Sequence, residues 1–355
     1  MPVIIDEHAE NHPAPPDHQR RPVRKRVMRT NLRALVGVAI SVAFIAILVR
    51  DIRWHELGTS LRRANVPLLG IATVALAGFY VLLALRWQLL LGTNAVDLSD
   101  AFTVLSIGAL CNVGLPMRGG DVVRALLLRQ RKRLSASYVL ASLVLEKLLD
   151  VTALLVLAML AVFVIDLPRW FATLLVAANV VVIFGITVCF LIERRGFVRV
   201  PAIMRGLIPE RALLHLDGLL HAFHSGLHIL GSFRTMLRAV ILSFASWIAV
   251  ALIAWLVAIA LHIGPVSLAT MLIVTAVISL GQIIPSSPGA LGTYELLGVS
   301  ALALFSVPRE PALEFTFVLH MLSILVQVTL GGASMGRIGF SMRRARRLRA
   351  EGSSV

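Results

Sequence analysis

The sequence has few charged residues and almost no cysteine. Only 15% of its 355 residues are Asp, Glu, Lys or Arg, whereas 58% are hydrophobic and the mean hydropathy is +0.86. Soluble domains are about 45–50% apolar, so this composition excludes an ordinary soluble protein. The two cysteines, Cys111 and Cys189, lie in separate apolar runs without a CxxC pattern. The sequence therefore predicts neither a disulfide framework nor a cysteine metal site.

Acidic residues are also scarce, because 19 Asp and Glu stand against 34 Lys and Arg, and the formal net charge is +15. A basic protein can bind nucleic acid, but here the basic residues cluster between apolar runs. Clusters of this kind orient membrane helices and contact anionic lipids. We therefore expect membrane lipids with an anionic headgroup as partners, and no nucleic acid.

Recognisable enzyme motifs are missing as well. The sequence has no Walker loop, HExxH motif, dinucleotide fingerprint or Ser-His-Asp order, so we expect no cofactor and no catalytic residues. A helix expected at 210–230 does carry Asp217, His221, His224 and His228 on one face. One straight helix cannot wrap four ligands around an ion, and its apolar face indicates a helix on the membrane surface instead.

Long apolar runs dominate what is present. A spanning helix needs about 20 apolar residues, and six runs qualify: 32–49, 66–91, 136–165, 170–192, 239–261 and 313–335. Three others are too short or too broken to be clear spans: 101–115, 268–284 and 292–306. Residues 1–31, rich in Pro, His and Arg, predict a disordered cytosolic tail, and 51–66 predicts a helix at the membrane surface.

Positive charge indicates whether the run 101–115 crosses the membrane. Short loops rich in Lys and Arg stay in the cytoplasm. If this run crossed, the six basic residues between Arg118 and Arg133 would lie outside. The sequence therefore predicts a hairpin that enters from the cytoplasm, breaks at Pro116 and Gly119-Gly120, and returns.

The same rule makes 268–306 a second hairpin, which enters from outside and breaks at 285–292. Span, hairpin, span then occurs twice in opposite orientations, at about 66–165 and 239–335. Such inverted repeats are typical of secondary transporters, whose broken helices bind substrate near the bilayer midplane. Both termini are then cytoplasmic.

The predicted fold is thus an all-α polytopic membrane bundle with six full spans and two re-entrant hairpins. It occupies residues 32–338, with a cytosolic amphipathic loop at 193–238 and a basic cytosolic tail at 339–355. The alternative is eight plain spans with proline kinks.

Three polar blocks interrupt the apolar sequence: NVGLPMRGGDVVR (112–124), LEKLLD (145–150) and IIPSSPGALGTYE (283–295). As an ordered set they resemble the lysylphosphatidylglycerol synthase transmembrane region family, also described as flippase-like proteins, over about residues 30–338. This sequence has Gly119-Gly120-Asp121 where members typically have Gly-Glu, and Glu146-Lys147 where Glu-Arg is common.

The resemblance implies a polytopic protein of lipid metabolism in a bacterial inner membrane. In the synthases of this family, such a domain moves the lipid that a separate soluble domain makes. The chain ends shortly after the last span, so we expect no such domain and no synthase activity. Other members are stand-alone proteins linked with isoprenoid, hopanoid or glycolipid pathways.

The first hairpin carries the residues expected to bind a lipid headgroup. Asp121 and Arg124 are three apart on the return helix and can pair, while Arg118 sits at the break, where backbone amides also attract an anion. A phosphate fits this set. The amide of Asn112 can satisfy carbonyls freed by Pro116. The alternative is a cytoplasmic loop with solvated charges.

The span 136–165 contains Glu146, Lys147 and Asp150, with the two acids on one helical face. Ionisable groups at the bilayer centre cost about 2.5–3.5 kcal/mol each on insertion scales, so they pair and mark a pathway. Glu146 and Asp150 either serve that pathway or form a structural ion pair, with Lys147 through Asp150 or with Arg124.

The second hairpin offers a matching set of polar and turn-forming residues: Gln282, Pro285, Pro288, Gly289, Gly292 and Glu295. Gln282 precedes Pro285 much as Asn112 precedes Pro116. Glu295 begins the exit helix, where the dipole favours a carboxylate or where it could carry a proton. We expect His320 to make a hydrogen-bonded helix contact rather than a proton relay.

Three classes of function remain. The expected one is translocation of a phospholipid, an isoprenoid- or hopanoid-type lipid or a glycolipid between leaflets. The alternatives are a non-catalytic partner that organises enzymes of a lipid or polysaccharide pathway, and a membrane enzyme with a lipid-phosphate donor. The sequence does not select the lipid or the oligomeric state.

Overall fold

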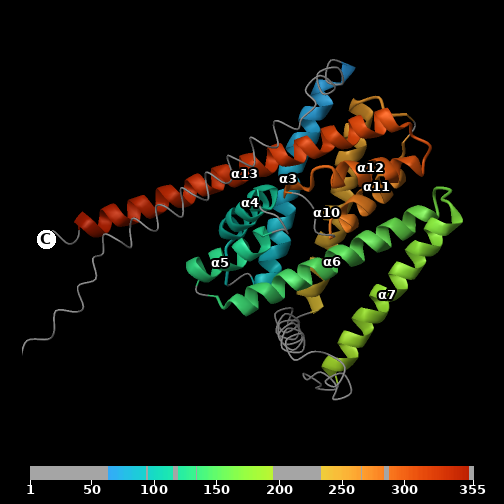
Figure 1. The fold of residues 1–355 in the computed structure, drawn as a ribbon. Helices are drawn as coiled ribbons and strands as arrows, with labels where there is room; N and C mark the ends of the chain where they lie inside the picture. Colours follow the sequence, from blue (N-terminus) through green and yellow to red (C-terminus); the bar gives the residue numbers. More distant parts are fainter. Residues whose placement is uncertain are drawn as a thin grey trace, which may run out of the picture. The chain divides into compact units, whose positions relative to one another are not determined.

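The computed structural model describes residues 63–92, 95–114, 119–132, 134–194, 233–264, 266–283 and 288–351. Within these residues the chain forms nine α-helices and one 3₁₀ turn, with no strand (Figure 1). The all-α prediction is therefore confirmed for this part of the chain. The predicted tail 1–31, the span 32–49 and the loop helix 210–230 lie outside the described residues, as do residues 51–62 of the predicted surface helix 51–66.

Among the residues that the structure describes, three helices are long and apolar enough to cross a membrane: α3 (Val66–Leu91), α10 (Phe233–Ala260) and the Arg309–Ile338 part of α13 (Arg309–Glu351). The bounds of α3 coincide with the predicted run 66–91. Two further predicted spans also form long helices, α6 (Ala136–Val162) and α7 (Arg169–Arg194). The α6 helix is long enough to span a membrane, but three ionisable residues in its middle turns make it less apolar than a typical spanning helix.

Four helices are much shorter: α4 (Leu98–Gly114), α5 (Gly120–Lys132), α11 (Leu268–Gly281) and α12 (Thr293–Ala303). At 1.5 Å per residue the longest of them, α4, extends about 25 Å and the shortest, α12, about 16 Å. The hydrocarbon core of a bilayer is about 30 Å thick. None of the four would cross it alone.

The α4 and α5 helices form a hairpin, which polar contacts hold at both ends. At the closed end, the Asn112 side-chain oxygen accepts a hydrogen bond of 2.8 Å from the Gly120 N–H. At the open end, Asp100 accepts hydrogen bonds from Lys132 and Arg131, both at 2.7 Å. The start of α4 and the end of α5 therefore lie together. Hydrogen bonds to Asp100 and Asp97 raise the pKa of Lys132.

Glycines allow α4 and α5 to approach closely. A Cβ at Gly120 would overlap with the Gly108 carbonyl and the Asn112 side chain, and one at Gly108 would overlap with the Arg124 side chain. The second hairpin is similar, because Gly281 at the end of α11 lies against Leu297 in α12. The two contacts of the first hairpin join late α4 to early α5 and middle α4 to the next turn of α5, so these helices are antiparallel.

The α3 and α10 helices pack antiparallel. The Asn65 N–H, at the start of α3, donates 2.8 Å to the Ala260 carbonyl at the end of α10. Near the other end, Arg86 donates 3.2 Å to the Ser243 hydroxyl. Small side chains permit this approach, as is usual between membrane helices. The buried alanines of the pair are Ala72, Ala84, Ala239, Ala251, Ala254, Ala258 and Ala260.

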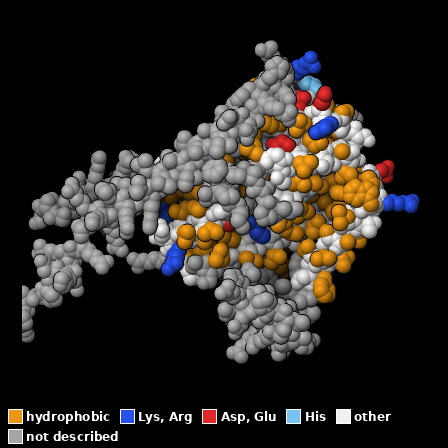
Figure 2. Space-filling view, in the orientation of Figure 1, with side chains coloured by type: hydrophobic (Ala, Val, Ile, Leu, Met, Phe, Trp, Pro, Cys, Tyr) orange, Lys and Arg blue, Asp and Glu red, His pale blue; other side chains and the backbone are white. Residues whose placement is uncertain are grey.

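The short helices pack against the long ones from the other half of the chain. The α4 helix contacts α13, and α11 contacts α6. At the first of these contacts Gly331 lies against Leu110 and the Ser106 carbonyl. The exposed surface is largely apolar, and Figure 2 shows hydrophobic side chains over most of the described surface on one face. Such a surface suits contact with lipid tails.

Candidate functional site

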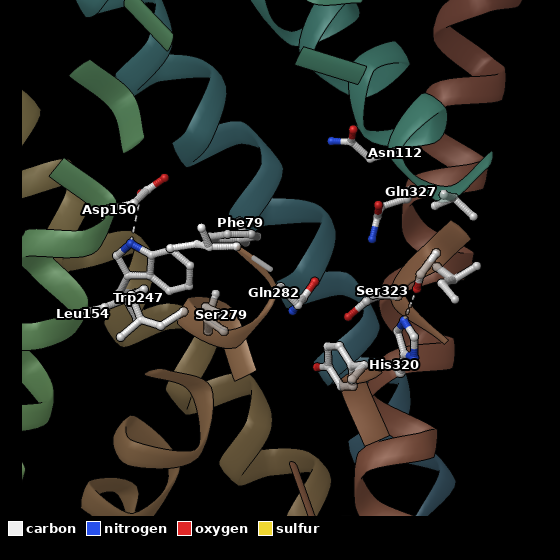
Figure 3. A pocket seen from close by; sticks show the side chains of 18 of the residues that line it. Phe79, Asn112, Asp150, Leu154, Trp247, Ser279, Gln282, His320, Ser323 and Gln327 are labelled. Carbon is white, nitrogen blue, oxygen red and sulfur yellow. Dashed lines mark hydrogen bonds between the residues drawn. The ribbon is translucent and has the colours of Figure 1, made fainter. Parts of the chain in front are cut away.

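A cavity of about 600 Å³ lies where the two hairpins meet the long helices. Its walls come from α3, α4, α5, α6, α10, α11, α12, α13 and the 3₁₀ turn η3 (Pro288–Ala290). Figure 3 shows Asp150 and Trp247 at one end, Gln282 in the middle, and His320 and Ser323 at the other end. Asn112 from the first hairpin and Gln282 and Gly289 from the second line the same space.

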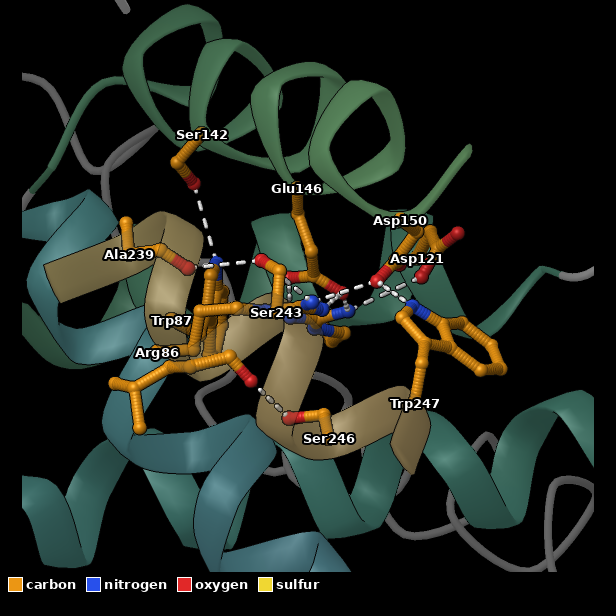
Figure 4. Close-up of polar contacts among 12 residues, drawn as sticks. Arg86, Trp87, Asp121, Ser142, Glu146, Asp150, Ala239, Ser243, Ser246 and Trp247 are labelled. Atoms are coloured by element: carbon orange, nitrogen blue, oxygen red, sulfur yellow. Dashed lines mark hydrogen bonds and ion pairs between the residues drawn. The ribbon is translucent and has the colours of Figure 1, made fainter. Parts of the chain in front are cut away.

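Buried charges surround one end of the cavity (Figure 4). The Arg86 side chain, only 1% exposed, donates 2.6 Å to Asp150 and lies 3.9 Å from Glu146. The same Asp150 oxygen accepts 3.0 Å from the indole N–H of Trp247. Three helices, α3, α6 and α10, are thus joined by one carboxylate.

Arg124 extends this network into the first hairpin. Its guanidinium donates 2.7 Å and 3.2 Å to the two oxygens of Glu146 and 3.4 Å to Asp121. It also lies 4.0 Å from the centre of the Trp87 ring, and a desolvated cation–π contact of this kind is worth about 2 kcal/mol or more. The Trp87 indole in turn donates 3.2 Å to the Ser142 hydroxyl.

Lys147 differs from the two arginines. It is exposed, it lines the cavity, and it makes no ion pair within 4 Å with any of the described side chains. Its neighbours Glu146 and Asp150 are engaged by Arg124 and Arg86. The cluster consists of three cations and three carboxylates and has no formal net charge: Arg86, Arg124, Lys147, Asp121, Glu146 and Asp150. The opposite charges offset the cost of burying the arginines, while the ammonium group of Lys147 remains accessible.

The opposite end of the cavity contains a second polar cluster. Nδ1 of His320 lies 2.7 Å from a Glu295 oxygen, and Nε2 lies 2.9 Å from the Gly289 carbonyl oxygen. The other Glu295 oxygen accepts 2.7 Å from the Gly292 N–H. The ring of Tyr294 stacks on the imidazole with centroids 4.1 Å apart. Gly289 and Gly292 have φ of 64° and 79°, which explains the need for glycine at both positions.

Most predicted site residues in the described chain lie around the cavity. Those that line it are Asn112, Asp121, Asp150, Gln282 and Gly289. Arg124 and Glu295 bond to the lining residues Asp121 and His320. Glu146 lies one step further away, because it bonds to Arg124, and Gly119 and Pro288 belong to the two helix breaks. Pro116, Arg118 and Pro285 lie outside the described residues.

The structure distinguishes between the predicted alternatives for individual side chains. Glu146 pairs with Arg124, as one alternative held, but Asp150 pairs with Arg86 rather than with Lys147. The Asn112 oxygen accepts from the N–H of Gly120, so this amide caps the return helix. His320 makes the predicted hydrogen-bonded helix contact.

Sequence reasoning missed Arg86 and Trp247 as members of the site, and it gave Lys147 a pairing role with Asp150 rather than an accessible place at the cavity. Arg86 offered one usable signal, because it is an ionisable residue within an apolar run and should have a buried partner. No local pattern identifies Trp247, since its partner Asp150 is 97 residues away.

Comparisons with known proteins bear on the whole chain. A family model described as the lysylphosphatidylglycerol synthase TM region matches residues 34–331. A UPF0104 membrane protein of the archaeon Methanothermobacter thermautotrophicus is 24% identical over 330 residues, which cover 87% of this chain and 97% of that protein. No solved structure matches the chain significantly.

Proposed function

Because this chain belongs to the lysylphosphatidylglycerol synthase transmembrane region family, a membrane protein family related to lipid metabolism, we propose that it moves a lipid between the two leaflets. The observation that carries the proposal is the cavity of about 600 Å³ shared by both helix breaks. The cavity is lined by an accessible cation, Lys147, by polar side chains such as Gln282 in its middle, and by apolar side chains. These are the surfaces that a headgroup and the start of its tails require.

The proposed architecture is the inverted repeat, with α3–α6 as one half and α10–α13 as the other. In this repeat α3, α4, α5 and α6 correspond to α10, α11, α12 and α13. The contacts between the halves and within them follow the same correspondence: the contact of α4 with α13 matches that of α11 with α6, and the contact of α5 with α6 matches that of α12 with α13. The α3–α10 contact maps onto itself. This pattern supports two hairpins of opposite orientation around one site, which is the plan of many alternating-access transporters.

Short helices support the re-entrant part of this proposal. The α4–α5 hairpin has both of its open ends together, joined by the Asp100–Lys132 pair, so the chain enters and leaves on one side. Irregular backbone at membrane depth is stable only where protein or a wet cavity lines it. We place the protein in a bacterial inner membrane with both termini cytoplasmic, on the positive-inside rule.

Lys147 is the proposed anchor for a headgroup phosphate. A phosphate would pair with its ammonium group without displacing the Arg86 and Arg124 ion pairs. Arg118 is the second cation that the sequence provides near the first break. The chain is proposed to act without catalysis, and enzymes that make the lipid or glycolipid are the proposed partners.

The test is transfer of fluorescent phospholipid across proteoliposomes, read by chemical quenching of the outer leaflet. Wild-type protein should move lipid without changing it. Lys147→Gln should lower the rate about 10- to 150-fold, because the loss of one charge-assisted contact costs about 1.5–3 kcal/mol. Arg169→Gln, which removes an exposed cation outside the cavity, should transfer lipid at the wild-type rate.

Other outcomes would identify the alternative functions. A new lipid in the mass spectrum would show an enzyme. Absence of transfer together with copurifying biosynthetic enzymes would show a partner protein, and the transport proposal would then be wrong.

A further inference from the structure

His320 is placed between two oxygen atoms, one at each ring nitrogen. Nδ1 faces the Glu295 carboxylate at 2.7 Å and Nε2 faces the Gly289 carbonyl at 2.9 Å. The His320 side chain is 5% exposed and that of Glu295 is 12% exposed. Water therefore has little access to either contact, and the pair must satisfy its own hydrogen bonds.

The number of protons in this arrangement follows from the inventory of donors. A neutral imidazole has one N–H, and a backbone carbonyl and an ionised carboxylate can only accept. Two hydrogen bonds therefore need two protons on the three groups. Either His320 is an imidazolium beside ionised Glu295, or neutral His320 accepts from protonated Glu295 and donates to Gly289. Both states hold one proton more than a neutral histidine with an ionised glutamate.

We propose that the Glu295–His320 pair is a proton-binding site that couples lipid movement to a proton. With its proton bound, the pair holds the Gly289 carbonyl and so fixes the second helix break, and we call Glu295, His320 and Gly289 together the latch. When the proton leaves to cavity water, His320 can donate only to one oxygen. The bond to the carboxylate is the stronger because it is charge-assisted. The Gly289 carbonyl then faces a bare nitrogen lone pair, and the turn at the break is released.

The location of the latch makes it suitable for coupling. Gly289, Tyr294 and His320 all line the cavity, so the proton exchanges with the space in which the headgroup is proposed to bind. Gly289 belongs to η3, which packs on α4 of the first hairpin. Release of one carbonyl therefore loosens the contact between the two hairpins. The coupling rests on the proposed transport function, whereas proton binding itself does not.

Other titratable groups lie near the Glu295–His320 pair, and their contribution to any pH dependence must be distinguished from that of the pair. The groups that line the same cavity are Tyr80 on α3, Asp121 on α5, Lys147 and Asp150 on α6, and Tyr294 on α12. Cys111 on α4 adjoins the lining residue Asn112, and Asp100 lies in the first turn of α4. The α10 helix carries Arg234 and Arg238, and α11 has no ionisable residue. The α13 helix itself carries Arg309, Glu310, Glu314, Arg337 and the charged residues of 343–351.

Glu295→Gln is the informative variant. A glutamine can accept from Gly292 with its oxygen and donate to Nδ1 of His320 with its amide, while neutral His320 donates to Gly289. Every contact of the latch is then made without the additional proton. His262→Asn is the matched control, because it removes an exposed histidine that does not line the cavity at a position with φ of 55°.

The first measurement is the melting temperature in detergent between pH 5 and 9. A folded pair that binds its proton more tightly than an unfolded histidine does is stabilised below the pKa of a free histidine, about 6.5, and this contribution is lost as the pH rises through the titration of the pair. Glu295→Gln should therefore flatten the fall in melting temperature that wild type and His262→Asn both show. An unchanged slope in Glu295→Gln would overturn the proton site.

The second measurement is the lipid distribution in proteoliposomes with a pH gradient and a clamped membrane potential. One proton per lipid predicts a tenfold leaflet bias for each pH unit in wild type and no bias in Glu295→Gln. Lipid transfer by wild type that ignores the gradient would overturn the coupling. Absence of any transfer would instead overturn the proposed function, and the melting slopes would still decide whether the pair binds a proton.

Discussion

Arg86 is one of the two arginines that hold the buried charge cluster together. It sits in an apolar helix with its side chain 1% exposed, and its partners Asp150 and Glu146 come from a helix 60 residues later in the chain. Removing one member of a buried pair leaves the other charge desolvated and uncompensated, which typically costs about 3–5 kcal/mol. The side chain is thus structural, although it borders the cavity.

We expect Arg86→Met to lower the melting temperature strongly and to reduce the yield of folded protein. Adding Asp150→Leu to Arg86→Met should recover part of the loss, because the double variant removes the stranded carboxylate. Thermal unfolding in detergent would measure both effects. If the double variant were less stable than Arg86→Met alone, Asp150 would owe its stabilising effect to Trp247 rather than to Arg86.

At the scale of elements, the first hairpin depends on glycine at the helix contact. The Gly120 Cα faces the Gly108 carbonyl and the Asn112 side chain, and no space remains there for a methyl group. An alanine would force α5 away from α4, and with it Arg124 away from Glu146. Overpacking of this kind costs about 1–3 kcal/mol.

Gly120→Ala should therefore lower both thermal stability and lipid transfer, because it shifts the helix that carries Asp121. Gly78→Ala provides the control, since Gly78 is an exposed helix residue with no atom within 4 Å of the added methyl group. It should be as stable as wild type or slightly more so. Equal stability of the two variants would show that the hairpin tolerates wider spacing.

At the scale of the whole molecule, the orientation of the hairpins decides whether one site can face both leaflets. The proposed topology places the end of α5 in the cytoplasm and the start of α13 outside. A single cysteine at Gln130 should react with an impermeant maleimide only from the cytoplasmic side, and one at Arg309 only from the outer side, each in a background in which Cys111 and Cys189 are replaced by Ser. Labelling of position 130 from outside would favour eight plain spans instead.

The sequence alone predicted that the described chain is helical, and most of the predicted site residues that fall in it lie around the cavity. The apolar run 66–91 predicted α3 with its observed bounds. A segment of this length in lipid must pair its own backbone N–H and C=O groups, and a helix does so. Ionisable residues within such runs identified Glu146 and Asp150, because each carries a cost that only a function or a partner can offset. The glycines of the second break were predicted from the turn that they permit, and two of them have positive φ.

Only the tertiary structure decided which charges pair and which remain accessible. Arg86 and Asp150, or His320 and Gly289, are distant in the sequence, and the helices that join them are placed by packing rather than by any local pattern. Helix packing therefore leaves Lys147 accessible at the cavity while both arginines are engaged. The same packing puts two acceptor oxygens around one imidazole, an arrangement that no spacing of residues along the chain could indicate.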